Sequence, residues 1–126
     1  YGTQDDALLK WLGDAGELMI VAGLQSIGLR PRHVALASDH FGYDIEFDRL
    51  GNVQGLEVKT VVPATSDRIL LSRNEFDVSR RMADHWKVVQ VTLSSQVIAR
   101  GRVTTADLLH IRELSSASLS LMALPD

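Results

Sequence analysis

Apolar and polar residues alternate most regularly between positions 42 and 62. Over residues 42–48 (GYDIEFD) apolar and acidic side chains alternate, and over residues 55–62 Leu56 and Val58 alternate with Glu57, Lys59 and Val61. A period of two is typical of half-buried strands. Residues 49–52 supply a Gly-Asn turn between the two segments. The pattern predicts an antiparallel hairpin whose apolar side, including Tyr43, Ile45 and Phe47, faces the core.

A helical period precedes and follows this hairpin. A short apolar patch at residues 8–12 is interrupted by Gly13, and Asp14 is expected to cap a helix that Gly28 ends. Its inward positions are Ile20, Leu24 and Ile27. A second helix is predicted over residues 74–83.

Further strands are predicted at residues 33–37 (HVALA) and 86–93 (WKVVQVTL), the latter being the most β-like run. Residues 69–72 form a short strand or a connecting segment. Toward the end we expect a strand over 97–103, a short helix over 105–110, and a strand or helix over 115–124. The order helix, three strands, helix, strand predicts an α/β domain with a mixed sheet flanked by helices.

Composition narrows the classes of protein to which the chain can belong. A length of 126 residues with 45% hydrophobic residues suits one domain with one core, and no apolar run is long enough for a membrane span, so no membrane partner is expected. The absence of cysteine excludes disulfides and zinc–thiolate sites and fits a cytoplasmic location. Because the first residue is Tyr1, we interpret the chain as a module of a larger protein whose other domains are partners.

Charge is distributed unevenly along the chain. The net charge of −3 argues against a protein that merely coats nucleic acid. Acidic residues gather between positions 39 and 57, and basic residues follow in the second half. A metal-dependent phosphodiesterase needs such a concentrated acidic site, although this distribution also arises by chance.

The hairpin brings three chemically useful side chains to one face. If its strands pair so that the apolar sets coincide, Asp44 lies on the face of Glu57 and Lys59. Two carboxylates suit Mg²⁺ or Mn²⁺, and a lysine adds a positive charge for water or phosphate. The competing interpretation is a solvated strand face with a surface ion pair, which contributes under about 1 kcal/mol.

Glu17 is a fourth candidate, because it lies on the expected inner side of the first helix. A buried glutamate needs a partner. It either belongs to the acidic site or closes a capping box with Asp14, and both roles are compatible.

The motifs resemble a known superfamily. G-E in the first helix, then G-Y-D-I-E, L-E-V-K-T and L-S-x-N-E-F, look like the PD-(D/E)xK nuclease superfamily, and more narrowly the NO VEIN C-terminal domain family and its restriction-endonuclease-like relatives. The resemblance covers about residues 16–91 and implies an αβββαβ core. It departs from the pattern at Tyr43, where proline is usual.

The resemblance implies a role for each matching residue. Asp44 and Glu57 correspond to the metal ligands, Lys59 to the catalytic lysine, and Glu17 to a helix glutamate that supports the metal through water. The pair Asn74-Glu75 matches a recurring family feature, for which we favour N-capping of the second helix by Asn74.

These residues imply a Mg²⁺- or Mn²⁺-dependent nuclease that cuts DNA in preference to RNA. Arg73, Arg80 and Arg81 are candidate contacts to the nucleic-acid backbone, although a solvated helix face is the favoured interpretation for all three. The oligomeric state stays open, a homodimer among the options. The alternatives are a recognition module for nucleic acid or protein with weak or no catalysis, and a purely structural interaction domain.

Other catalytic patterns are missing from the sequence. The histidines at 33, 40, 85 and 110 lack metal-ligand spacing and are expected to be surface or core residues. There is no nucleophile elbow, Walker loop or dinucleotide fingerprint. Trp11 and Trp86 are expected to pack in the core, with base stacking as the minor alternative.

Overall fold

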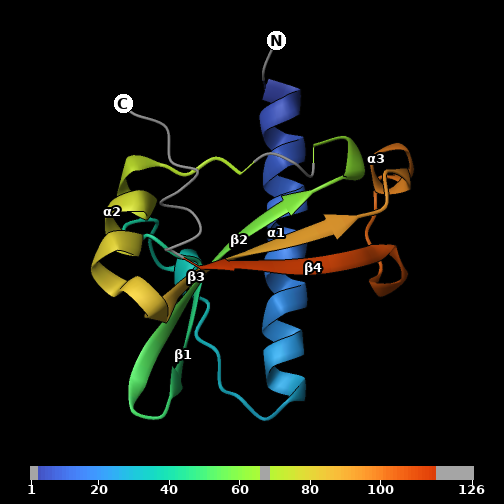
Figure 1. Cartoon of the computed structure of the whole chain (residues 1–126). Coiled ribbons are helices and arrows are strands. Elements are labelled where there is room, and N and C mark those ends of the chain that lie inside the picture. Colours follow the sequence, from blue (N-terminus) through green and yellow to red (C-terminus); the bar gives the residue numbers. More distant parts are fainter. Residues whose placement is uncertain (1–2, 66–68, 116–126) are drawn as a thin grey trace.

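A four-stranded mixed sheet lies between two helices in the computed structural model (Figure 1). The structure describes residues 3–65 and 69–115. The helices are α1 (Thr3–Ser26), α2 (Arg73–Met82) and α3 (Gln96–Arg100), and the strands are β1 (Ile45–Arg49), β2 (Asn52–Val61), β3 (Trp86–Leu93) and β4 (Leu108–Ser115). Short 3-10 helices span Val34–Leu36, Pro63–Thr65, Ala83–His85 and Thr105–Asp107. Within the described ranges, no helix combines the length and apolar character that crossing a membrane requires.

The strands follow the order β1-β2-β3-β4, and β2 and β3 are central. The β1–β2 and β3–β4 pairs are antiparallel, whereas β2 and β3 run parallel with α2 in the connection between them. The α/β class with a mixed sheet and flanking helices is therefore confirmed, and it is consistent with a restriction-endonuclease-like core.

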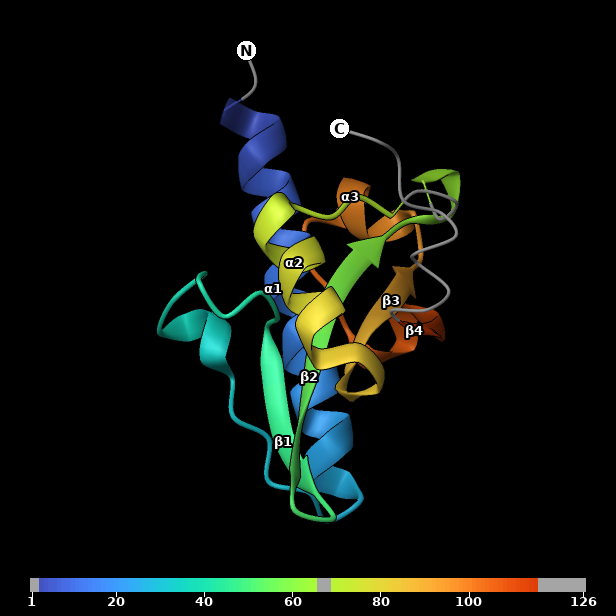
Figure 2. The same ribbon diagram turned by 60° about the vertical axis from the view of Figure 1, so that its left-hand side comes forward.

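Each face of the sheet has its own hydrophobic cluster. On one face, Ile45, Leu56 and Val58 pack against α1 through Leu12 and Ile20. On the other face, Val88 and Trp86 pack against Val78 of α2. Figure 2 shows α2 in front of the sheet and α1 behind it. The side chains of β2 that alternate with Leu56 and Val58 therefore point toward α2.

The first helix is longer than predicted. Instead of a break at Gly13 and a cap at Asp14, α1 is continuous, and Asp14 lies in its interior with an ion pair to Lys10 at 3.3 Å. An interior glycine costs about 1 kcal/mol relative to alanine. The helix continues because Leu12 and Ile20, on either side of Gly13, are both buried in the same cluster. Gly28, at φ 89°, ends the helix as predicted. Ile27, which was predicted to face inward, is 72% exposed.

The strand predicted over residues 33–37 is a 3-10 turn. Only Arg32 pairs with the sheet, through two backbone hydrogen bonds with Glu46. The Ala35 N–H then bonds the carbonyl oxygen of Asp44 at 3.1 Å, so the chain curls around residue 44 instead of extending along β1.

Tyr43 lies on the opposite side of the sheet from the predicted one. Gly42 adopts φ 78°, and β1 begins only at Ile45, so the strand alternation does not extend back to residue 43. The Tyr43 ring lies over Gly55 and packs with the α2 cluster, while its hydroxyl donates to Glu46 at 2.7 Å.

The second half matches the prediction in β3 and differs after it. Residues 86–93 form β3 as expected, and residues 69–72 carry no regular structure. The strand expected over 97–103 is replaced by α3 and a loop. Where a short helix was expected over 105–110, a 3-10 helix spans Thr105–Asp107 and β4 begins at Leu108. The element expected over 115–124 lies almost entirely outside the described residues.

Candidate active site

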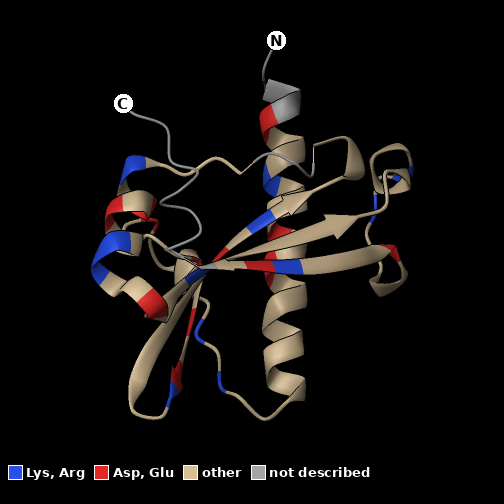
Figure 3. Cartoon of the chain, in the orientation of Figure 1, with Lys and Arg blue, Asp and Glu red and all other residues tan. Residues whose placement is uncertain are grey.

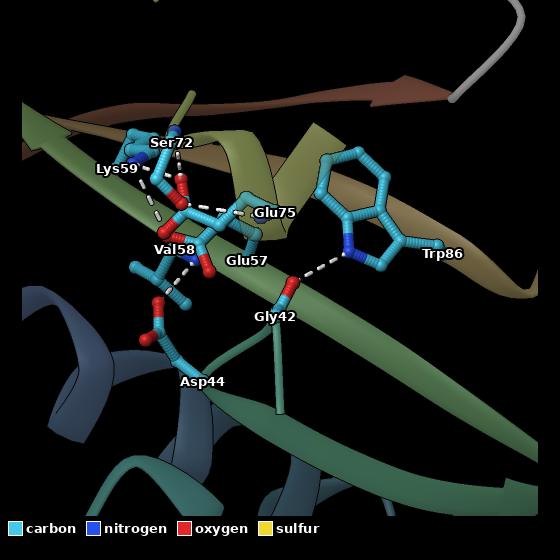
Figure 4. A network of polar contacts seen from close by, with 8 residues as sticks. All are labelled: Gly42, Asp44, Glu57, Val58, Lys59, Ser72, Glu75 and Trp86. Atoms are coloured by element: carbon cyan, nitrogen blue, oxygen red, sulfur yellow. Dashed lines mark hydrogen bonds and ion pairs between the residues drawn. The ribbon is translucent and has the colours of Figure 1, made fainter. Parts of the chain in front are cut away.

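Asp44 is fixed by three hydrogen bonds at the entrance to β1. Its N–H donates to the Leu56 carbonyl at 2.9 Å, and its carbonyl accepts from Ala35. Its carboxylate Oδ2 accepts the Val58 N–H at 2.8 Å, as Figure 4 shows. Asp44 directly precedes β1, whose first residue Ile45 pairs with Leu56, and it bonds Leu56 and Val58, the two residues that flank Glu57 on β2.

The loop before Asp44 is held by α2 and β3. The buried Trp86 indole N–H donates to the Gly42 carbonyl at 2.9 Å, and the Asn74 side-chain amide donates to the His40 carbonyl at 3.0 Å. A Cβ at Gly42 would lie 2.4 Å from Val78 Cγ2, so only glycine fits between the loop and α2. These contacts place Asp44 relative to the sheet and α2 together.

Glu57 and Lys59 project from β2 toward α2. Glu57 is only 4% exposed, because β2 is a central strand and α2 covers this face. Lys59 Nζ lies 3.2 Å from Glu57 Oε2 and 3.1 Å from Glu75 Oε1 (Figure 4). Strand alternation therefore delivers one acid and one base to the same covered space.

Glu17 does not form the capping box considered from the sequence, because Asp14 is inside the helix and not at its N-cap. Glu17 Oε1 and His33 Nε2 lie 2.5 Å apart, with both side chains mostly buried. The Glu17 charge also acts on Asp44, raising its pKa together with burial. Glu17 thus borders the acidic site, and through His33 it contacts the segment that curls around residue 44.

Burial and repulsion keep both central acids readily protonated. Burial raises the pKa of Asp44 to about 6, with the charges of Glu17 and Glu75 acting in the same direction and the Val58 N–H opposing them. Burial and then the Asp44 charge raise the pKa of Glu57 to about 9, against the effect of Lys59. Burial lowers the pKa of Lys59, but the Glu57 and Glu75 charges outweigh it and hold the value above the ordinary one.

The donor chemistry suits a hard divalent cation. Within residues 3–65 and 69–115, no group of three or more histidine, cysteine or acidic side chains is arranged to hold a metal ion. Mg²⁺, however, commonly binds one or two carboxylates and completes its coordination with water and substrate phosphate. Asp44 and Glu57 would supply two such carboxylates, and a bound cation would offset the Asp44 charge, which adds to burial in raising the pKa of Glu57.

The predicted residues divide into two groups. The structure brings Asp44, Glu57 and Lys59 together, with Glu17 at the border. The three arginines at 73, 80 and 81 are exposed on α2. By helical periodicity Arg73 and Arg80 lie on the opposite side of the helix from Glu75. Arg73 pairs with Asp77 at 3.2 Å, and Figure 3 shows basic and acidic residues side by side along α2.

Sequence reasoning missed the partners of these residues. Glu75 contacts Lys59, and Ser72, not Asn74, is the N-cap of α2. The spacing Ser72-x-x-Glu75 is the sequence signature of a capping box and could have identified both residues. His33 contacts Glu17 although its spacing gave no signal, because the contact depends on the 3-10 turn that follows it.

Comparison with known proteins gives one match. The profile of the family described as Protein NO VEIN, C-terminal, matches residues 19–102, about two thirds of the chain. This range contains Asp44, Glu57, Lys59 and Glu75 and leaves Glu17 outside. No curated protein and no solved structure matches the chain.

Proposed function

The chain belongs to the NO VEIN C-terminal family, and from this premise we propose that it is a metal-dependent nuclease domain that hydrolyses phosphodiester bonds. DNA is the favoured substrate over RNA. We assign the chemistry to the site formed by Asp44, Glu57 and Lys59. We also propose that the domain acts in the cytoplasm as part of a larger DNA-processing or defence protein.

The observation that carries this proposal is the burial of Glu57 beside a second acid. A carboxylate that is 4% exposed is strongly disfavoured in its charged form unless it has a partner. Here Lys59 is one partner, yet Asp44 lies across the strand pair and adds repulsion. An arrangement that keeps two acids together in a covered space destabilises the fold, and a cation-dependent activity explains why it is present.

Each residue has a distinct task in the proposed reaction. Asp44 and Glu57 would hold Mg²⁺ or Mn²⁺, which supplies an activated water and neutralises charge on the phosphate. Lys59, held by carboxylates on two sides, directs its ammonium at the attacking water or at the charge that builds on the phosphate. Glu17 supports the site from α1, and its contact with His33 fixes its orientation.

Substrate contact is expected to come from the surface around α2. Arg73, Arg80 and Arg81 are exposed there, Arg73 in an ion pair with Asp77, and two of the three lie on the side of the helix away from Glu75. Their contribution would be to affinity and not to turnover. Replacing Arg80 and Arg81 by alanine should weaken binding at low salt and reduce its salt dependence.

The test is cleavage of DNA by the 126-residue chain with Mg²⁺ or Mn²⁺, and its loss with EDTA. Asp44→Asn should abolish turnover and also Mn²⁺ binding measured by calorimetry, because it removes a charged oxygen ligand. Asp14→Asn, which removes an exposed acid on α1, is the matched control and should cleave like the wild type. Cleavage that persists in EDTA would contradict the proposal.

One observation favours the alternative of a recognition module without turnover. Lys59 already has two carboxylate partners, so its charge is compensated within the protein, as in a purely structural cluster. Such a module would bind DNA without cutting it, and Asp44→Asn would leave that binding unchanged in the presence or absence of Mg²⁺.

A further inference from the structure

Glu75 takes part in two separate arrangements through one oxygen atom. Its Oε1 accepts the Ser72 N–H at 3.0 Å, which closes the capping box of α2, and the Lys59 ammonium at 3.1 Å. The reciprocal bond of the box runs from the Glu75 N–H to Ser72 Oγ at 3.1 Å. The first turn of α2 is thereby joined directly to the lysine on β2 (Figure 4).

We propose that Glu75 is a positioning residue that holds the Lys59 ammonium beside Glu57 through its negative charge. The inference rests on the proposed function, because it assigns Glu75 a task in the same site. Nothing in the capping role requires this charge. A capping box forms equally well with glutamine, whose side-chain oxygen accepts the same N–H.

The need for a second carboxylate follows from the position of Glu57. Glu57 contacts Lys59 at 3.2 Å and is also one of the two acids assigned to the cation. When Glu57 binds the cation, its negative charge is partly neutralised, so its attraction for the Lys59 ammonium becomes weaker. Glu75 comes from α2 and not from β2, and its Oε1 lies 3.1 Å from Lys59 Nζ, so it can hold the ammonium while Glu57 serves the cation.

Glu75 also has the setting expected of such a residue. Its side chain is 20% exposed and that of Lys59 is 25% exposed, so water screens their attraction only partly. The capping box fixes the rotamer of Glu75, so its carboxylate is oriented independently of the contact with Lys59. A surface ion pair between two flexible side chains has neither property.

The experiment uses Glu75→Gln in the 126-residue chain, because this change removes the charge and preserves the cap. The readout is the rate at which an amine-reactive acylating reagent modifies each lysine, followed by mass spectrometry. The exposed Lys10 and the half-exposed Lys87 serve as internal standards. Ser72→Ala is the matched variant, since it removes the cap bond and keeps the Glu75 charge.

We expect acylation of Lys59 to rise at least about threefold relative to the standards in Glu75→Gln and to change little in Ser72→Ala. The opposite order, with Ser72→Ala releasing Lys59 and Glu75→Gln leaving it protected, would overturn the proposal and leave Glu75 as a capping residue only. This readout requires no turnover, so it separates failure of the positioning role from failure of the proposed nuclease function.

A Mn²⁺ titration distinguishes positioning from metal ligation. If Glu75 positions Lys59, then Glu75→Gln binds Mn²⁺ within about threefold of the wild type, whereas Asp44→Asn loses binding. Loss of Mn²⁺ binding in both variants would make Glu75 a ligand and contradict the inference. Where DNA is cleaved, Glu75→Gln should lower kcat by about tenfold with little change in KM, because the lysine acts on the transition state.

Discussion

At the scale of single residues, the fold holds several like-charged side chains close together in the site. Glu57 and Glu75 contact one ammonium, that of Lys59, and the charge of Asp44 acts on Glu57 as well, so a single lysine cannot neutralise three carboxylates. Burial and repulsion raise the pKa of Asp44 to about 6 and that of Glu57 to about 9. Local contacts maintain this proximity, because the Val58 N–H holds the Asp44 carboxylate and Glu57 is buried on the neighbouring position of β2.

These shifts predict how stability depends on pH. The folded-state pKa values of Asp44 and Glu57 lie above the ordinary values of 3.8 and 4.5, so between about pH 4 and 9 the native state binds more protons than the unfolded state. The free energy of unfolding of the metal-free protein should therefore fall as the pH rises through this window. Urea denaturation at several pH values measures it.

Asp44→Asn is the control for this pH dependence. It removes one titrating acid and its repulsion on Glu57, so stability should decline less steeply with pH than in the wild type. A wild-type protein that becomes more stable between pH 5 and 8 would show that the two acids are not held together as described.

Gly42 is the residue on which the placement of Asp44 depends most. Gly42→Ala introduces a Cβ at φ 78° that overlaps the buried Val78. Gly51→Ala is its control, because Gly51 has φ 82° and open space around it. Both variants carry the strain of a left-handed alanine, about 1 kcal/mol. Gly42→Ala should lose at least about 1 kcal/mol more, since overpacking adds to it. Equal losses in chemical denaturation would mean that the loop and α2 are not in close contact.

At the scale of elements, the site depends on how α2 is anchored against the sheet. Ser72 caps the helix, Glu75 reaches Lys59, and Val78 packs on Gly42 and the second cluster. The helix therefore contributes a charge and also sets the loop that carries Asp44. Its short length of 10 residues makes these end contacts important, because an isolated helix of that size is marginal in water.

The cap of α2 yields a prediction about stability. Ser72→Ala removes the hydrogen bond from Glu75 N–H to the serine hydroxyl and should cost about 1 kcal/mol of unfolding free energy. Ser95→Ala is the matched control, because Ser95 precedes α3 without a side-chain capping bond. Urea denaturation should show a change within about 0.5 kcal/mol for Ser95→Ala. A similar loss in both variants would contradict the capping assignment.

The sequence predicted the elements whose pattern is local. The alternation within residues 42–48 and 55–62 and the β-branched run at 86–93 indicated β1, β2 and β3, and with them that Asp44 lies close to the segment of Glu57. It could not predict features that depend on tertiary contacts. The continuity of α1 through Gly13 needs packing on both sides, and the side on which Tyr43 lies follows from the conformation of Gly42. The role of Glu75 appears only once α2 is placed beside β2.

At the scale of the whole molecule, a helix covers each face of the sheet, and the two faces have different roles. The face toward α1 is apolar and supplies most of the core, while the face toward α2 combines a smaller apolar cluster with the charged residues. Polar side chains can be concentrated near α2 because α1 and the larger cluster stabilise the sheet from behind. The family match runs from the C-terminal part of α1 to the end of α3 and contains Asp44, Glu57, Lys59 and Glu75, but not Glu17.

The measurement that tests the central claim most directly is the rate of DNA cleavage by the wild type and by Lys59→Ala under identical Mg²⁺ concentrations. DNA affinity of both proteins is measured in parallel with Ca²⁺ in place of Mg²⁺. The predicted result is a loss of turnover of at least about 100-fold with affinity within about threefold, because Lys59 stabilises charge that exists only in the transition state. Wild-type cleavage rates in Lys59→Ala, or a wild type that binds DNA without cutting it, would contradict the account.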